Sequence, residues 1–114
     1  MNLSYENQFI KSLVLDTYHT NRLRERVDSP IFKFMSDELY ESFIAWLLVN
    51  HVKYDTTRAK FCMRVTKLVR NEEKHTGFDG LKKSRCGQGV MYKMDARALH
   101  AELRAQQWLT HDEM

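Results

Sequence analysis

Cationic side chains recur along one side of a helix that the sequence predicts over residues 57–71. Lys60, Arg64 and Lys67 follow one another at intervals of four and three residues, so they share a helical face, and Arg58 stands at its start. Lysine and arginine donate to guanine acceptors at base edges and to phosphate oxygens. This face therefore indicates recognition of a polyanion, and a single cationic helix suits the major groove of duplex DNA.

The other side of the same segment is apolar. Phe61, Val65, Leu68 and Val69 recur at helical spacing, which predicts a stripe that can be buried. Thr56 or Thr57 can cap the first turn, because threonine oxygens accept from free amide groups there. The segment is thus an amphipathic helix with a cationic outer face.

A second basic element follows a loop that contains Gly77 and Gly80. The sequence LKKSRC, a glycine-rich turn over residues 86–89 and then VMYKM predict two short strands joined by a hairpin. The hairpin carries Lys82, Lys83 and Arg85 on its first strand, and Gln88 at its tip. Such a hairpin beside such a helix is typical of a wing.

The remaining segments supply the support that the basic helix needs. Residues 2–27 predict a first helix, with Tyr5, Phe9 and Leu13 along one side; Ser29 and Pro30 then break it, and an apolar segment at 31–34 suits a short strand. A core helix capped by Ser36 or Asp37 presents a wide apolar surface, made of Leu39, Tyr40, Phe43, Ile44, Trp46, Leu47 and Leu48. Asp95 caps a last helix over residues 96–108. The acidic residues after Leu109 predict a loose tail.

The order of these elements predicts the fold class. A helix, a break at residues 50–55 and a basic helix form helix-turn-helix geometry. We therefore expect a mainly α (α+β) winged helix-turn-helix with three to four helices and a small β-hairpin wing. Residues 1–28 are expected to form an N-terminal helix and connector, 29–109 the DNA-binding domain and 110–114 a tail.

The charge distribution supports a polyanionic partner. The formal net charge of the 114 residues is only +3. Residues 51–93, however, hold eleven Lys and Arg against four Asp and Glu, a net charge of +7, whereas the rest of the chain carries −4. Positive charge concentrated on the predicted helix and hairpin favours binding to nucleic acid.

Several classes of protein are disfavoured by the sequence. The longest apolar run, residues 43–49, is much shorter than the ~20 residues of a membrane span, and no signal-peptide pattern is present, so we expect a cytoplasmic protein without membrane contact. Cys62 and Cys86 are too few and too far apart for a zinc pair and predict reduced thiols. No phosphate-binding loop, HExxH motif or nucleophile elbow occurs, and the five histidines are scattered. We therefore expect no enzyme activity, catalytic residue, metal or cofactor.

Four groups of residues form a recognisable pattern: the segment 28–34 (DSPIFKF); Leu39, Tyr40, Phe43 and Trp46; Phe61 inside the basic helix; and the glycine turn leading to Val90, Met91 and Tyr92. This pattern resembles the C-terminal region of phage, plasmid and large-DNA-virus primase-helicases. The resemblance covers roughly residues 20–108. It implies a winged-helix domain that binds a replication origin. This sequence lacks the helicase and primase segments of that family, so ATPase and priming activity cannot be assigned to it.

The sequence thus predicts sequence-specific binding of double-stranded DNA, with replication-origin recognition as the role that the resemblance implies. The alternatives are a dimeric transcription regulator and a winged-helix protein-interaction module, and the partner in a longer parent chain would be a covalently linked helicase domain. The DNA-binding candidates are Thr57, Arg58, Lys60, Arg64, Lys67, Lys82, Lys83, Arg85 and Gln88. We expect Thr57, Arg58, Lys60 and Arg64 to reach base edges, Lys67, Lys82, Lys83 and Arg85 to hold phosphates, and Gln88 to enter the minor groove.

Overall fold

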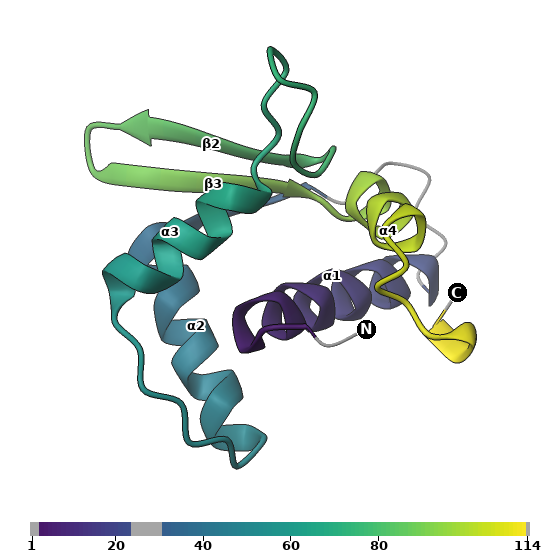
Figure 1. Cartoon of the computed structure of the whole chain (residues 1–114), viewed down its shortest axis with the longest axis horizontal. Helices are drawn as coiled ribbons and strands as arrows, with labels where there is room; N and C mark the ends of the chain where they lie inside the picture. The colour runs from purple at the N-terminus through teal and green to yellow at the C-terminus, as the bar shows by residue number, and fades with distance from the viewer. Residues whose placement is uncertain (1–2, 24–30, 114) are drawn as a thin grey trace.

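The computed structural model describes residues 3–23 and 31–113, which form an α+β fold of four α-helices, a three-stranded antiparallel sheet and a short 3-10 helix (Figure 1). The predicted break at Ser29 and Pro30 lies outside the described residues. In chain order the elements are α1 (Tyr5–Leu23), β1 (Ile31–Met35), α2 (Ser36–Val49), α3 (Arg58–Leu68), β2 (Leu81–Cys86), β3 (Gly89–Asp95), α4 (Ala96–Ala105) and η1 (His111–Glu113).

The sheet has the strand order β1-β3-β2, so the last strand in the chain lies in the middle. β2 and β3 form the predicted hairpin, with Gly87 and Gln88 between them. The apolar segment predicted as a possible strand is confirmed as β1, which pairs with β3 from Ile31 opposite Asp95 to Met35 opposite Met91. Both neighbours of β3 are antiparallel to it. Successive side chains of each strand point to opposite faces of the sheet, so residues that pair directly across strands lie on the same face.

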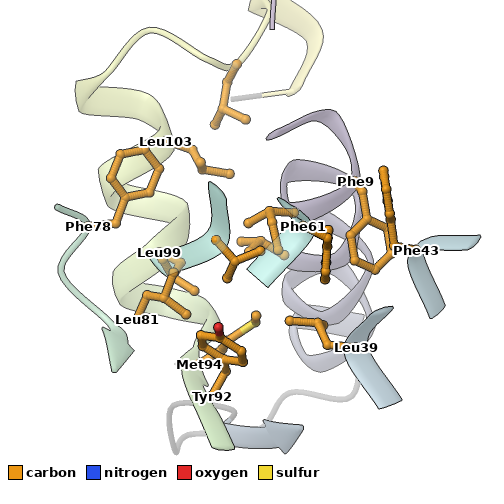
Figure 2. Packing of buried hydrophobic residues seen from close by; sticks show 14 of the residues in the cluster. Phe9, Leu39, Phe43, Phe61, Phe78, Leu81, Tyr92, Met94, Leu99 and Leu103 are labelled. Carbon is orange, nitrogen blue, oxygen red and sulfur yellow. The ribbon is translucent and has the colours of Figure 1, made fainter. Parts of the chain in front are cut away.

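The inner face of the sheet and all four helices contribute to one hydrophobic core, shown in part in Figure 2. Tyr92 and Met94 point into it from β3 and are fully buried. The rings of Phe43 on α2 and Phe61 on α3 stack with centroids 4.7 Å apart and an interplanar angle of 12°. Phe9 on α1 lies 5.4 Å from Phe43 between ring centroids. These aromatic contacts fix α1, α2 and α3 against one another.

The buried side of α1 matches the predicted one only in part, since Leu13 is half-buried and packs against the core. Phe9 is buried as expected, but its companions are Ile10 and Val14, and Glu6 is also buried. Tyr5, which was predicted to lie on the apolar stripe, is 37% exposed. A spacing of three or four residues defines the buried face of a helix only to within about one position. In the folded protein, α1 is rotated so that residues one position further along the chain also face the core.

The N-cap of helix α2 precedes the predicted cap by one residue. Met35 is the N-cap, and its backbone N–H donates to the Glu38 carboxylate at 3.2 Å, so the prediction that Ser36 or Asp37 caps the helix is wrong. Because β1 ends at Met35 and α2 begins at Ser36, the last residue of the strand is also the N-cap of the helix. Phe43 and the residues one turn away on each side are buried, but Leu48 is 71% exposed, so the predicted apolar surface is too wide.

Helix α3 starts as predicted and ends earlier. Thr57 caps it, because its side-chain oxygen accepts from the Lys60 amide at 3.2 Å. The helix ends at Leu68 rather than Asn71, since Val69 is extended and forms an isolated bridge with Phe78. Gly77 makes that close approach possible: it has φ +84°, and a Cβ there would lie 2.1 Å from the Val69 carbonyl oxygen.

Helix α4 is capped by Asp95 as predicted, through bonds from the Arg97 and Ala98 amides, but ends at Ala105 rather than residue 108. Residues 111–113, which were predicted to lie in a loose tail, instead form η1. There the Glu113 carboxylate lies 2.7 Å from the ammonium of Lys11 on α1. Burial acts to raise the pKa of Glu113, but the bonds with Lys11 and Thr110 lower it on balance.

Candidate nucleic-acid interface

The exposed face of α3 carries the cations that the sequence predicted. Phe61 and Val65 are fully buried on the other side, which turns Lys60, Arg64 and Lys67 outward. Lys60 and Lys67 make no ion pair with the described residues, so their ammonium groups are available. Met63 lies on the same face and is 58% exposed, so this face also offers an apolar contact between its cations.

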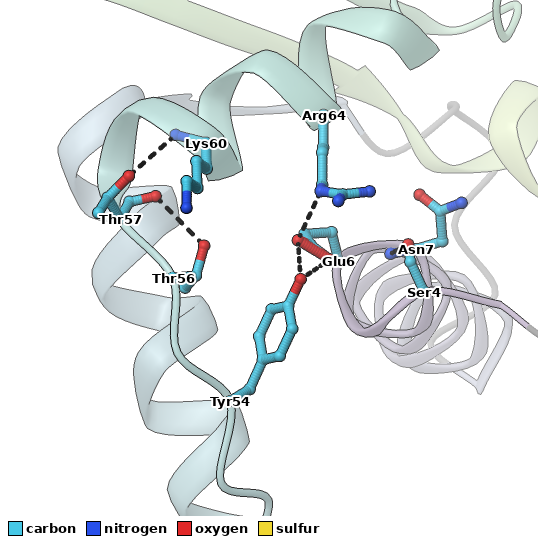
Figure 3. Close-up of polar contacts among 8 residues, drawn as sticks. All are labelled: Ser4, Glu6, Asn7, Tyr54, Thr56, Thr57, Lys60 and Arg64. Atoms are coloured by element: carbon cyan, nitrogen blue, oxygen red, sulfur yellow. Dashed lines mark hydrogen bonds and ion pairs between the residues drawn. The ribbon is translucent and has the colours of Figure 1, made fainter.

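Arg64 is held by a buried carboxylate that the sequence prediction missed. Its Nε lies 3.2 Å from Oε2 of Glu6 on α1, and Glu6 is only 1% exposed (Figure 3). The Tyr54 hydroxyl, from the α2–α3 loop, donates to the same carboxylate at 2.9 and 3.1 Å. Burial raises the pKa of Tyr54, and the hydrogen bond to Glu6 raises it further.

This cluster joins α1 to the α2–α3 loop and to α3, which lie about 50 residues further along the chain. A buried carboxylate needs partners, and here a phenol and a guanidinium supply them. The Arg64 side chain stays 52% exposed, so its Nε is held by Glu6 while the rest of the side chain partly faces solvent. A helical argument could have found Glu6: it lies three and four residues before Phe9 and Ile10, on the face that those residues bury.

Arg58 makes a different ion pair. Its guanidinium contacts the Asp37 carboxylate in the first turn of α2, and the two side chains are 60% and 65% exposed. A pair this exposed contributes little to stability. It does, however, commit part of the Arg58 guanidinium to a contact between the first turns of α2 and α3.

The hairpin is hydrogen-bonded to α3 through one face of its strands. The Tyr92 hydroxyl lies 3.2 Å from the Thr66 hydroxyl on α3, and Lys83 Nζ donates to the same Thr66 oxygen at 3.1 Å. Burial raises the pKa of Tyr92. Lys83 pairs with Tyr92 and Arg85 with Val90 across the hairpin, so Lys83 and Arg85 lie on the sheet face that meets α3.

A hollow of about 460 Å³ lies between α3, the start of α2 and the hairpin. It brings together three of the predicted residues, Arg58 from α3 and Lys83 and Gln88 from the hairpin. Cys62 also lines it, and burial raises the pKa of that thiol, which disfavours a reactive thiolate. A larger hollow of about 660 Å³ beside α1 contains none of the predicted residues.

The structure does not bring all nine predicted residues to one face. Lys82 precedes Lys83 on β2, and successive strand residues point to opposite faces, so Lys82 lies on the outer side of the sheet. Its neighbours there are Lys93 on β3 and Lys33 on β1, which the sequence prediction did not include. Strand register brings these lysines together, and register cannot be read from their spacing in the chain.

Among residues 3–23 and 31–113, no three His, Cys, Asp or Glu side chains are grouped to hold a metal ion, and Cys62 and Cys86 are unbonded thiols. None of the described helices combines the length and hydropathy that crossing a membrane requires. Comparisons with protein-family models, curated proteins and solved structures found no match. The resemblance to primase-helicases therefore stays a prediction.

Proposed function

We propose that this chain is a winged helix-turn-helix domain that binds double-stranded DNA in a sequence-specific manner, with α3 in the major groove. The observation that carries the proposal is the outward face of α3, where Lys60, Arg64 and Lys67 surround an exposed Met63. A helix with cationic side chains at the contact face and an apolar group among them can bind phosphates, base acceptors and thymine methyl groups.

The arrangement of elements supports the same proposal. α2 packs on α3 through Phe43 and Phe61, as a supporting helix packs on a recognition helix. The β2–β3 hairpin is bonded to α3 through Thr66 and Tyr92, so a wing would approach DNA on the same side as the helix. Gln88 lies at the hairpin tip, where the wing would meet an adjacent groove.

The contacts suggest how the roles are divided. Arg64 is positioned by Glu6, and positioned donors suit base edges, since base contacts depend on geometry. Thr57 and Lys60 lie in the leading turn beside it and would contribute to this readout. Lys67, Lys83 and Arg85 would hold phosphates and add affinity without sequence preference. Origin recognition is the role that the primase-helicase resemblance implies.

One observation favours a protein partner in addition to DNA. Leu48 and Val49 at the end of α2 are 71% and 76% exposed. Adjacent exposed apolar side chains suit contact with another protein, either a second copy in a dimeric regulator or a different chain. A palindromic site with half-sites about one helical turn apart, together with a concentration-dependent mass, would favour the dimer.

The proposal can be tested by fluorescence anisotropy with a pool of labelled duplexes, including fragments from around the replication origin of the genome that encodes the chain. The titrations are repeated between about 50 and 200 mM salt, where a protein with several phosphate contacts loses orders of magnitude in affinity. We expect steep salt dependence and a preference of at least about a hundredfold for one fragment. Absence of binding at the lowest salt would refute DNA binding, and equal affinity for all fragments would refute specific recognition.

A further inference from the structure

The outer face of the sheet carries three lysines in one row. Lys93 on the central strand β3 lies directly opposite Lys33 on β1 and directly opposite Lys82 on β2. All three side chains are exposed, and none makes an ion pair with a described residue. With neighbouring strands about 4.8 Å apart, the row spans about 10 Å.

This row lowers the stability of the folded protein, because like charges directly opposite one another on a sheet repel. Lysines on edge strands can be explained as protection against edge-to-edge pairing, and that explanation fits Lys33 and Lys82. It does not fit Lys93, which lies on the central strand. The adjacent outer-face positions hold the uncharged Met35 and Met91, and a single carboxylate, Asp95, which also accepts from the Arg97 and Ala98 amides at the start of α4.

We infer that the outer face of the sheet is a second binding surface, and that its partner is the phosphate backbone of duplex DNA. Lysine ammonium groups act as point charges that bind phosphate without demanding a fixed geometry. A row of about 10 Å is long enough to contact more than one phosphate of a duplex, since each strand carries one negative charge for about every 3.4 Å of helix axis. This inference takes the identity of the polyanion from the proposed function, but it does not require α3 to bind.

Other nucleic-acid partners fit this face less well. Recognition of single strands relies on aromatic side chains that stack on bases. The outer-face positions around the row hold Met35, Met91, Ser84 and Ile31, none of which is aromatic. The surface would therefore bind duplexes through their backbone and without sequence preference.

The two binding surfaces lie on opposite sides of the sheet. Lys83 bonds to α3 on the inner side, and Lys82 points outward from the next position. One molecule could therefore hold one duplex on α3 and a second on the lysine row. Bridging of two duplexes is the activity that distinguishes this inference from binding at α3 alone.

The test measures capture of a second duplex. A 16-bp duplex is immobilised on beads, protein is bound, and recovery of a second, fluorescent 16-bp duplex is recorded at about 50 mM salt, where phosphate contacts are strong. The row variant Lys33→Gln/Lys82→Gln/Lys93→Gln is compared with Lys53→Gln/Lys74→Gln/Arg97→Gln, which removes the same charge from exposed positions elsewhere. Thermal unfolding checks that both variants are folded.

We expect the wild type and the control variant to capture the second duplex and the row variant to lose at least about tenfold in capture, while its affinity for a single duplex by anisotropy changes only slightly. Capture by the row variant at the wild-type level would overturn the inference. A wild type that binds one duplex but never a second would overturn it when the duplex is bound at α3.

A nuclear magnetic resonance titration of the wild-type protein with the same 16-bp duplex separates this inference from the proposed function. Shifts at Lys33, Lys82 and Lys93 without shifts on α3 would support the row and refute the proposed role of α3. Shifts on α3 alone would do the reverse. Parallel titrations use a polyglutamate peptide and vesicles that contain phosphatidylserine; binding of either at the row, with no response there to the duplex, would overturn the choice of DNA.

Discussion

The exposed face of α3 and the outer face of the sheet are both cationic, but they are constructed differently. On α3, Arg64 is bonded to the buried Glu6, and Arg58 contacts Asp37. On the sheet, Lys33 and Lys93 have no carboxylate partner among the described residues and are placed only by strand register. The first arrangement fixes donor positions, and the second concentrates charge.

This difference teaches how charge can serve two purposes in a small chain. Donors whose positions are fixed can discriminate between base edges, because discrimination depends on geometry. Lysines that are free to move supply affinity and a steep salt dependence, whatever the sequence. The same difference predicts opposite effects on stability: removing support from α3 should destabilise the protein, whereas removing charge from the lysine row should stabilise it.

The largest effect is expected when a buried aromatic side chain of α3 is truncated. Phe61 is fully buried and stacks on Phe43, so Phe61→Ala leaves a cavity between α2 and α3. We expect it to lower the free energy of unfolding by about 3–5 kcal/mol in urea denaturation. Met63→Ala, on the exposed face of the same helix, is the control and should change it by less than about 0.5 kcal/mol. Similar losses for both variants would contradict the packing of α3.

A smaller loss is expected when the anchor of Arg64 is changed. Glu6→Gln keeps the size of the side chain but removes the charge that Arg64 and Tyr54 share. We expect a loss of about 1–3 kcal/mol in the free energy of unfolding, as for other buried hydrogen-bonded groups. The exposed Glu41→Gln on α2 should have almost no effect. If the two variants were equally stable, Glu6 would not anchor α3.

A further loss should develop at alkaline pH. Burial raises the pKa of Tyr54 and of Tyr92 above the ordinary value of 10.0, and both hydroxyls lie against residues that hold α3. The folded state then keeps protons that the unfolded state releases, so unfolding becomes easier as pH rises through these pKa values. Urea midpoints should be constant near pH 8 and fall above pH 10, with a shallower fall for Tyr54→Phe. A midpoint that rises with pH would contradict this sign.

The smallest effect has the opposite sign. Lys93→Gln removes the central charge of the lysine row and should raise the free energy of unfolding by about 0.2–1 kcal/mol. The gain should shrink at high salt, because salt screens the repulsion in the wild type. Lys53→Gln, an exposed lysine in the α2–α3 loop, serves as the control and should show no gain. Destabilisation by Lys93→Gln would show that the row is not under repulsion.

Local features of this fold could be predicted from the sequence, because their causes lie within a few residues. Thr57 and Asp95 cap α3 and α4 through their own side chains, and the glycines around Gln88 specify the hairpin turn. The apolar spacing of Phe61 and Val65 determines which side of α3 is buried.

Features that depend on distant pairing could not be predicted. Glu6 is 58 residues from Arg64 in the chain, and only the packing of α1 against α3 brings them together. Lys33 and Lys93 meet because β1 and β3 pair in one particular register, and a shift of one residue would place one of them on the other face. The prediction therefore located the cations of α3 but not the carboxylate that pairs with Arg64, and it grouped Lys82 with Lys83 and Arg85, which lie on the other face of the sheet.

The central claim, that the exposed face of α3 binds duplex DNA, is tested most directly by two charge-matched double variants. Lys60→Gln/Lys67→Gln removes two cations from this face, and Lys53→Gln/Lys74→Gln removes two exposed lysines from the loops on either side of α3. Anisotropy titrations on the preferred duplex across a salt series give the affinity and the salt slope of each. We predict that the α3 variant loses about two units of slope and the part of the sequence preference that Lys60 contributes, whereas the loop variant behaves like the wild type. Equal affinity and slope for the two variants would contradict the claim.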